Sequence, residues 1–248
     1  MKLTTLFVFC LLLFTAGSFA QCPTSFANLT SAAQLSTIEI SCFGQATADI
    51  LATIPAAACA GFTAEQAKQL AYSFDDACSG FSAACGAAFS ISGVSAFTRD
   101  CVGSLSSSFI GSLPVDRITV IPVLSCDGFA ANLAGLNANC AGFTSDQLGD
   151  LAYYSASSCS LLTEVCAASI MPSAASGFRK ACFGATSPLF ISALSPEVIH
   201  ELPSEAIAEL SKKSLANISI GCSGFTSDQA TNLGSSHYDA CTALSVAC

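Results

Sequence analysis

The chain has 248 residues, of which only 10% are charged, and its acidic residues outnumber its basic ones by 17 to 8. The net charge of −9 argues against nucleic acid and anionic membranes as partners, because both attract basic patches. With 52% hydrophobic residues and 18 phenylalanines, the composition favours a compact, packed protein over a disordered one.

The amino-terminal residues have the features of a secretory signal peptide. Lys2 supplies a positive charge, and the apolar stretch 6–14 is too short to cross a bilayer. Ser18-Phe19-Ala20 places small residues at the two positions that a signal peptidase recognises. We therefore expect residues 1–20 to be removed and the protein to be secreted without membrane insertion. The alternative, an uncleaved anchor helix, needs about 20 apolar residues.

Two sequons agree with an extracellular location. The tripeptides Asn28-Leu29-Thr30 and Asn217-Ile218-Ser219 predict N-glycosylation at Asn28 and Asn217.

Cysteine is the main compositional signal. The chain has 15 cysteines, of which Cys10 lies in the expected signal peptide, and the even number that remains predicts a disulfide framework. Metal binding is the competing hypothesis. Because His200 and His237 are the two histidines and no C-x-x-C pair occurs, we expect neither a metal site nor a cofactor. The cysteines expected in disulfides are Cys22, Cys42, Cys59, Cys78, Cys85, Cys101, Cys126, Cys140, Cys159, Cys166, Cys182, Cys222, Cys241 and Cys248.

One sequence unit occurs three times. The pattern C-x-G-F-T-x-x-Q stands at 59–66, 140–147 and 222–229, and each time it opens the array C-x18-C-x6-C. The copies are 81 or 82 residues apart, which chance does not produce. The mature chain therefore divides into three repeat units at 22–85, 86–166 and 167–248, of which the first is shortened.

Each copy of the pattern predicts the start of a helix. Thr63, Thr144 and Thr226 are N-cap candidates, and the glutamine three residues later completes a T-x-x-Q capping box. We expect a helix of about 14 residues to run from each box to the middle cysteine of the array.

A finer period runs through the third unit. Leu194, Leu202 and Leu210 are eight residues apart, and prolines lie close to these leucines in the sequence. This period predicts a ladder of stacked helices of one or two turns each, because one long helix tolerates internal prolines badly. The alternative is a single amphipathic helix over 204–217. The sequence thus predicts an all-α, disulfide-stapled helical repeat of the solenoid kind.

The segment 194–207, read with the Gly-Phe-Thr-Ser-Asp-Gln run at 224–229, resembles the superhelical repeats of the mesothelin, otoancorin and stereocilin family. Those proteins carry L-S-P-E steps that end in an aliphatic residue and proline, and F-T-x-x-Q helix starts. The resemblance covers about half of the mature chain. It implies an armadillo-like helical superhelix at a cell surface or in extracellular matrix, with an adhesive function.

Disulfide connectivity is not fixed by the sequence, but geometry limits it. A helix of about 14 residues would hold Cys59 and Cys78 about 20 Å apart, whereas a disulfide needs Cα atoms within about 7 Å. We expect the later two cysteines of each unit to pair across a turn, and the earlier two likewise. Cys22 and Cys126 are then left as one further pair. The expected pairs in the units are Cys78–Cys85, Cys159–Cys166, Cys241–Cys248, Cys42–Cys59, Cys101–Cys140 and Cys182–Cys222.

The sequence offers little for catalysis. It contains no G-x-S-x-G, P-loop, G-x-G-x-x-G or H-E-x-x-H motif. We interpret His237-Tyr238-Asp239 and His200 as exposed helix residues, and Asp75-Asp76 as a solvated face in preference to a glycosidase-like pair. We expect no enzyme activity.

The repeated Phe62, Phe143 and Phe225 allow two interpretations. They could line a groove for a carbohydrate or lipid, or each could be a hydrophobic staple that packs on its own helix, which we favour.

Two functions follow from these features. The first is a secreted, non-enzymatic structural or adhesive component of an extracellular coat, wall or matrix. The alternative is a soluble extracellular binding module, similar to a lectin, lipid carrier or effector, that uses a concave solenoid surface. The expected partner is an extracellular protein or glycan, with self-association as a further expectation.

Overall fold

The computed structural model describes residues 22–70, 76–151, 153–216, 218 and 221–236. Over these residues the protein is all-α, as the sequence predicts, and holds no strand. The expected signal peptide, Asn217, His237 and the last two cysteines, Cys241 and Cys248, lie outside the described residues, as does the side chain of Cys222.

Short helices follow one another along the whole described chain. The first ten are α2 Ala32–Ser36, α3 Ile40–Phe43, α4 Ala48–Ala52, α5 Ala56–Cys59, α6 Ala64–Gln69, η2 Ala77–Gly80, α7 Ala83–Ala88, α8 Ile91–Val94, α9 Arg99–Ser104 and α10 Ser107–Ser112. The next eight are α11 Val115–Ile118, η3 Val123–Ala131, η4 Leu133–Gly135, η5 Asn137–Gly142, α12 Ser145–Asp150, η6 Ala156–Leu161, α13 Glu164–Ser169 and α14 Pro172–Ala175. The last seven are α15 Lys180–Ala185, α16 Pro188–Ser192, α17 Pro196–Glu201, α18 Ser204–Ile207, α19 Lys212–Ala216, η7 Gly221–Gly224 and α20 Ser227–Ser236.

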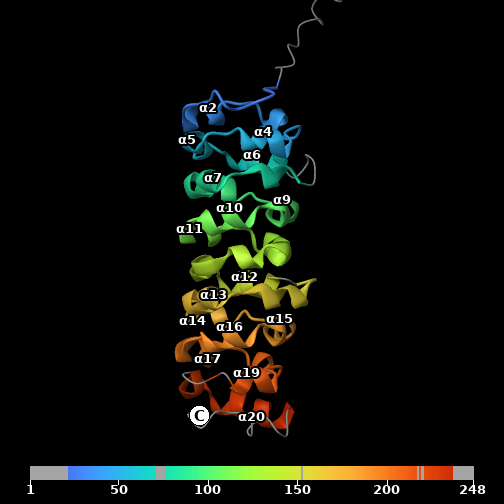
Figure 1. Cartoon of the computed structure of the whole chain (residues 1–248), viewed down its shortest axis with the longest axis vertical. Coiled ribbons are helices and arrows are strands. Elements are labelled where there is room, and N and C mark those ends of the chain that lie inside the picture. The colour runs from blue at the N-terminus through green and yellow to red at the C-terminus, as the bar shows by residue number, and fades with distance from the viewer. Residues whose placement is uncertain (1–21, 71–75, 152, 217, 219–220, 237–248) are drawn as a thin grey trace, which may run out of the picture.

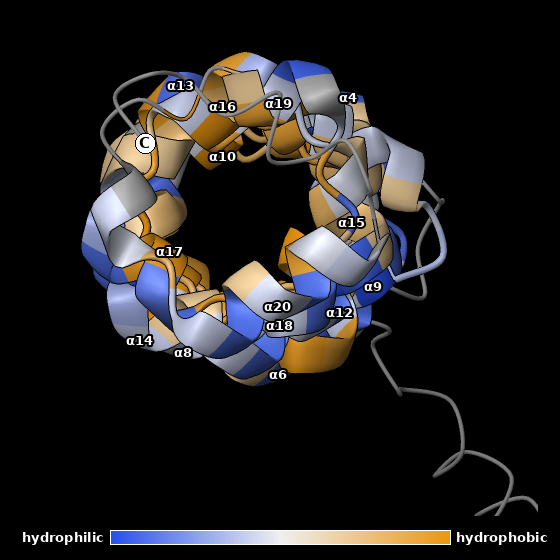
Figure 2. Ribbon diagram, turned by 90° about the horizontal axis from the view of Figure 1, so that it is seen from below, coloured by the Kyte–Doolittle hydropathy of each residue, from blue (hydrophilic) through white to orange (hydrophobic). Residues whose placement is uncertain are grey.

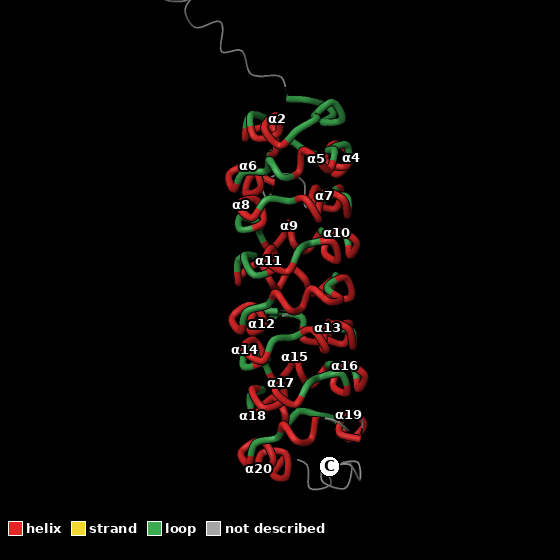
Figure 3. Tube along the Cα trace, turned by 90° about the vertical axis from the view of Figure 1, so that its left-hand side faces the viewer, coloured by secondary structure: helices red, strands yellow, loops and turns green. Residues whose placement is uncertain are grey.

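The helices wind into an elongated column (Figures 1 and 3). Each one packs on the helix three places further along the chain: α2 on α5, α3 on α6, α4 on η2, and so on to α18 on α20. Three short helices therefore make one turn, and seen along the axis the turns form a ring (Figure 2). The buried apolar side chains form one continuous cluster from Phe26 in the first turn to Leu233 in α20.

Local chemistry explains why the helices are so short. Many begin at a serine or threonine whose hydroxyl accepts a hydrogen bond from the amide three residues on, as at Ser31, Thr98 and Ser187. Others begin after a proline with extended backbone, as at Pro55 and Pro203. Most of these starts lie eight residues after the one before, which leaves most of the helices one or two turns long.

The predicted ladder is confirmed, and the single helix over 204–217 is wrong. Helix α18 ends at Ile207 and α19 begins at Lys212. The predicted helices of about 14 residues are wrong in the first two units, where α6 and α12 have 6 residues each. In the third unit α20 is described over 10 residues, and the positions that follow lie outside the described residues. In α12 the extended backbone of Leu151, with ψ at 120°, ends the helix and sends this side chain into the core.

The glutamine of each capping box does more than cap its own helix. In α12, Gln147 Oε1 accepts from Thr144 N at 2.9 Å, which completes the box. Its Nε2 reaches the preceding turn and donates to the carbonyls of Ile118 and Ile121 at 2.9 and 2.7 Å. The side chain is 1% exposed. Gln66 and Gln229 make the same contacts to residues 27 to 31 positions earlier.

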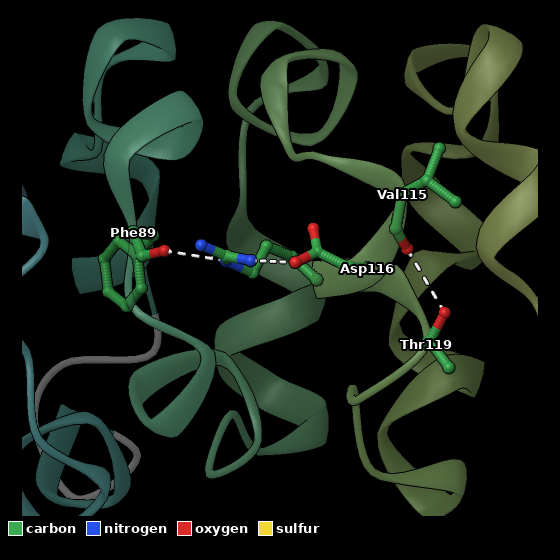
Figure 4. A network of polar contacts seen from close by, with 5 residues as sticks. Phe89, Val115, Asp116 and Thr119 are labelled. Carbon is green, nitrogen blue, oxygen red and sulfur yellow. Dashed lines mark hydrogen bonds and ion pairs between the residues drawn. The ribbon is translucent and has the colours of Figure 1, made fainter.

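An arginine makes another tie between turns (Figure 4). Arg117 in α11 donates from Nε to the carbonyl of Phe89 at 3.1 Å and also pairs with Asp116 beside it. Thr119, two residues after Arg117, donates to Val115 O in α11 and to Gly142 O in the following turn of the column. Backbone carbonyls at the ends of short helices are thus satisfied from the neighbouring turn.

The disulfides also join neighbouring turns. Four of them link a helix to the helix three places on, with Cα atoms 5.1 to 5.4 Å apart. The fifth joins Cys22 to Cys42 in α3. The described disulfides are Cys22–Cys42, Cys59–Cys85, Cys78–Cys101, Cys140–Cys166 and Cys159–Cys182.

The expected pairing is therefore wrong at every bridge that the structure describes. The pairs Cys78–Cys85, Cys159–Cys166, Cys42–Cys59, Cys101–Cys140, Cys182–Cys222 and Cys22–Cys126 do not form. The reason is the direction of packing. Cysteines that are near in sequence lie on successive helices of one turn, whereas those 23 or 26 residues apart are stacked on each other. Cys241–Cys248 lies outside the described residues.

We expect Gln147→Ala to lower the free energy of unfolding by about 1–3 kcal/mol, because it leaves the carbonyl of Ile121 in the preceding turn without a donor and removes one of the two donors to the carbonyl of Ile118. Urea unfolding followed by circular dichroism measures the change. Gln34→Ala is the matched control, since Gln34 is exposed and its Oε1 accepts only from Thr30. Equal stability of the two variants would contradict the role of the buried amide.

Gly142→Ala should also destabilise the protein. A Cβ at Gly142 would overlap the backbone of Val115 and the side chain of Ile118 in the preceding turn, so the two turns would have to separate. At Gly234 in α20 a Cβ meets no atom within 4 Å, so Gly234→Ala should be neutral or stabilising by up to about 1 kcal/mol. Melting temperatures of the two variants measure this; a Gly142→Ala protein as stable as the parent would show that the turns tolerate a wider spacing.

Candidate functional site

Two adjacent tyrosines break the pattern of buried aromatic side chains. Tyr153 and Tyr154, between α12 and η6, are 47% and 74% exposed. Their rings meet edge to face, with centroids 4.7 Å apart. The described phenylalanines, in contrast, lie in or against the core. We call this pair the tyrosine ledge.

An arginine backs each ring of the ledge. The guanidinium of Arg99, the first residue of α9, lies 5.3 Å from the ring centroid of Tyr154. The guanidinium of Arg179, which precedes α15, lies 4.3 Å from that of Tyr153, and its Nε donates to Gly149 O. These cation–π contacts come from the turns on either side, so the ledge is held from both directions.

The buried carboxylate of Asp127 holds the ledge in place. It lies in η3 and is 4% exposed. Its Oδ1 accepts from the backbone N–H of Tyr154 at 3.0 Å. Its Oδ2 lies 2.5 Å from Arg99 Nη2, an ion pair without hydrogen-bond alignment, so among the described residues this buried oxygen has charge compensation but no hydrogen-bond donor.

Asp150, at the end of α12, adds a second carboxylate. Partial burial and the charge of Asp127 raise the pKa of the Asp150 carboxyl, while Arg179 and Arg99 lower it. The opposing effects show that the two acids and two arginines share one electrostatic environment. Positive and negative charges are therefore mixed at the ledge.

Two hollows are lined by the arginines that contact the tyrosines. The larger, of about 520 Å³, is lined by Arg99, Asp127 and Ser155 together with small residues such as Gly103 and Gly128. The other, of about 390 Å³, is lined by Arg179, Asp150 and Asp146 with Ser145 and Ser176. Each hollow thus combines an arginine, at least one carboxylate and a serine hydroxyl. Both volumes fall in the range typical of small-molecule sites.

The sequence did not point to this site, although two of the chain's four tyrosines stand side by side at 153–154. Of the residues it did single out, Phe62 and Phe143 are buried in the core and line no groove. Phe62, for example, stacks on Phe89 at 4.6 Å. Phe225 is partly buried and packs against the same core. These rings therefore contribute to the shared core of the column and do not pack on their own helix alone.

The other predicted residues do not come together. His200 is exposed in α17, as predicted, while His237, Asp75 and Asn217 lie outside the described residues. Asp76 and the sequon residue Asn28 are exposed. In the part of the chain that the structure describes, no three His, Cys, Asp or Glu side chains are grouped to hold a metal ion. No described helix has the length and apolarity needed to cross a membrane.

Cys126 is the one free cysteine of the described residues. It is fully buried in η3, and burial, with a contribution from Asp150, raises the pKa of its thiol to about 12.

Neither models of known protein families nor curated proteins give a significant match to this chain.

We expect Cys126 to resist alkylation in the folded protein. At pH 8 only about one thiol in 10,000 would be ionised at the raised pKa, and burial blocks access. Treatment with iodoacetamide before and after unfolding in guanidinium, without reductant, followed by peptide mass mapping, measures this. Modification of Cys126 in the native protein would contradict it.

Proposed function

We propose that this protein is a secreted, non-enzymatic structural or adhesive component of an extracellular coat, wall or matrix. Within it the column acts as a stiff, cross-linked rod. Secretion, the signal peptide at 1–20 and glycosylation at Asn28 and Asn217 are parts of this proposal. So is the adhesive role implied by the resemblance to mesothelin-type repeats.

The observation that carries the proposal is the attachment of each turn to the next. Disulfides such as Cys59–Cys85 and Cys140–Cys166 join stacked helices, and one apolar cluster runs through the described turns. A bridge of this kind is worth about 2–4 kcal/mol and persists in an oxidising compartment. A chain fastened along its whole length resists local opening, which suits a load-bearing or spacing element.

The alternative is a soluble extracellular binding module, which the tyrosine ledge favours. Binding would then use the outer surface of the column, because the buried apolar side chains form one continuous core along the described chain. The two functions are compatible when an adhesive rod carries its binding site on its outside.

Fractionation of the producing cells tests the structural role. We expect most of the full-length protein in the cell-surface and detergent-insoluble fractions, detected by blotting with and without reductant. Release by reductant would add that disulfides join different chains. Protein found free in the medium, at monomer size under both conditions, would overturn the proposal.

A Cys126→Ser variant is the control for this fractionation. Because Cys126 is buried and unpaired, its loss should leave the distribution between fractions unchanged. A changed distribution would mean that the assay reports on damaged folding and not on incorporation.

A further inference from the structure

We infer that the tyrosine ledge and the two hollows beside it bind a neutral oligosaccharide. The inference deepens the adhesive part of the proposed function, and therefore rests on it, by naming the chemical class of the partner. Its elements are the rings of Tyr153 and Tyr154, the ion pair Arg99–Asp127, and the residues Arg179 and Asp150 that line the second hollow.

The exposed rings supply a flat apolar surface of the kind that a sugar ring covers. An aromatic face carries partial negative charge, whereas the C–H groups on the flat side of a pyranose carry partial positive charge. Tyr154 is 74% exposed although Arg99 approaches its ring, so most of its surface is open to a ligand. Because the contacts with arginine and with Tyr153 already restrain the ring, binding costs little side-chain entropy.

The hollows supply partners for hydroxyl groups. A sugar hydroxyl both donates and accepts hydrogen bonds, so it needs donors and acceptors side by side. In the larger hollow, Arg99 can donate, Asp100 can accept, and Ser155 can do either. Asp127 is buried and already bound by Tyr154 N and by Arg99, so it holds the ledge in place and does not itself face a ligand.

Charge favours a neutral ligand over an ionic one. Arg99 is paired with Asp127, and Arg179 lies near Asp150, so neither hollow has a free excess of positive charge. The chain as a whole carries −9 charges, which repels acidic polysaccharides. Arg99, which approaches Tyr154, lines one hollow, and Arg179, which approaches Tyr153, lines the other, so a ligand that occupies both hollows has at least two sugar units.

An ion pair between turns does not by itself indicate a binding site. The equivalent pair in the third unit, Lys180–Glu209, has a distance of 3.6 Å and is largely exposed, with side chains 63% and 48% accessible. No tyrosine stands beside it in the described residues. Among the described residues, only the second unit combines a buried carboxylate with exposed tyrosine rings at this position.

The experiment is a titration of the purified, disulfide-bonded full chain with defined oligosaccharides, followed by saturation-transfer NMR and calorimetry. The neutral probes are cellotetraose, laminaritetraose, mannotetraose and chitotetraose, and the acidic ones are tetragalacturonate and a heparin tetrasaccharide. We expect at least one neutral probe to bind and neither acidic probe to do so. Binding of acidic probes alone, or of none of the neutral ones, would overturn the inference.

Variants test the position of the site. Tyr154→Ala should weaken the bound probe by about tenfold or more, while Tyr154→Phe should change its affinity by less than about threefold. Leu189→Ala is the matched control, because Leu189 is 61% exposed on α16, away from the ledge. Arg179→Ala should weaken a tetrasaccharide more than the corresponding disaccharide if the ligand spans both hollows.

Each substituted side chain is exposed or half-exposed, so an unchanged melting temperature can verify that the variants are folded. An affinity that Tyr154→Ala leaves unchanged would overturn the inference. That result would leave the fractionation outcome standing, since incorporation into insoluble material does not depend on this titration.

Discussion

The structure depends on the attachment of each turn of helices to the turn before it. A helix of four to six residues leaves most of its backbone N–H and C=O groups without partners of its own and does not persist alone in water. The buried amides of Gln66, Gln147 and Gln229 donate to carbonyls at such helix ends one turn earlier. The short helices are therefore stable because their neighbours complete them, and the stability of the column resides largely between adjacent turns.

The repeated pattern C-x-G-F-T-x-x-Q can now be explained position by position. In the second copy the cysteine bridges to the following turn, and Gly142 lies against the backbone of the preceding one. Phe143 enters the core, Thr144 caps α12, and Gln147 returns to the preceding turn. These five residues together start the helix and fasten its turn in both directions, which accounts for their recurrence together at one spacing.

The sequence predicted what is local and missed what depends on the winding. Hydroxyl caps, capping boxes and the eight-residue steps are determined by neighbouring residues, so the ladder of short helices could be derived. The partner of Cys59 could not, because it depends on how many helices make a turn. The sequence repeats every 81 or 82 residues, whereas stacked cysteines are 23 or 26 residues apart, so one repeat covers several turns. The sequence period therefore does not reveal the three-helix turn that brings Cys85 to Cys59.

The three units share this winding but present different outer surfaces. Equivalent helices of successive units, such as α9 and α15, lie on the same side of the column (Figures 1 and 2), so the difference between the faces comes from their side chains. The pair Arg99–Asp127 and its counterpart Lys180–Glu209 preserve the ion pair between turns, yet only the first is combined with an exposed Tyr154. Residues that join one turn to the next point inward or between turns and must recur in each unit. The residues that point outward can differ from one unit to another. A repeat of this kind can therefore keep its rod uniform while one unit acquires a recognition surface.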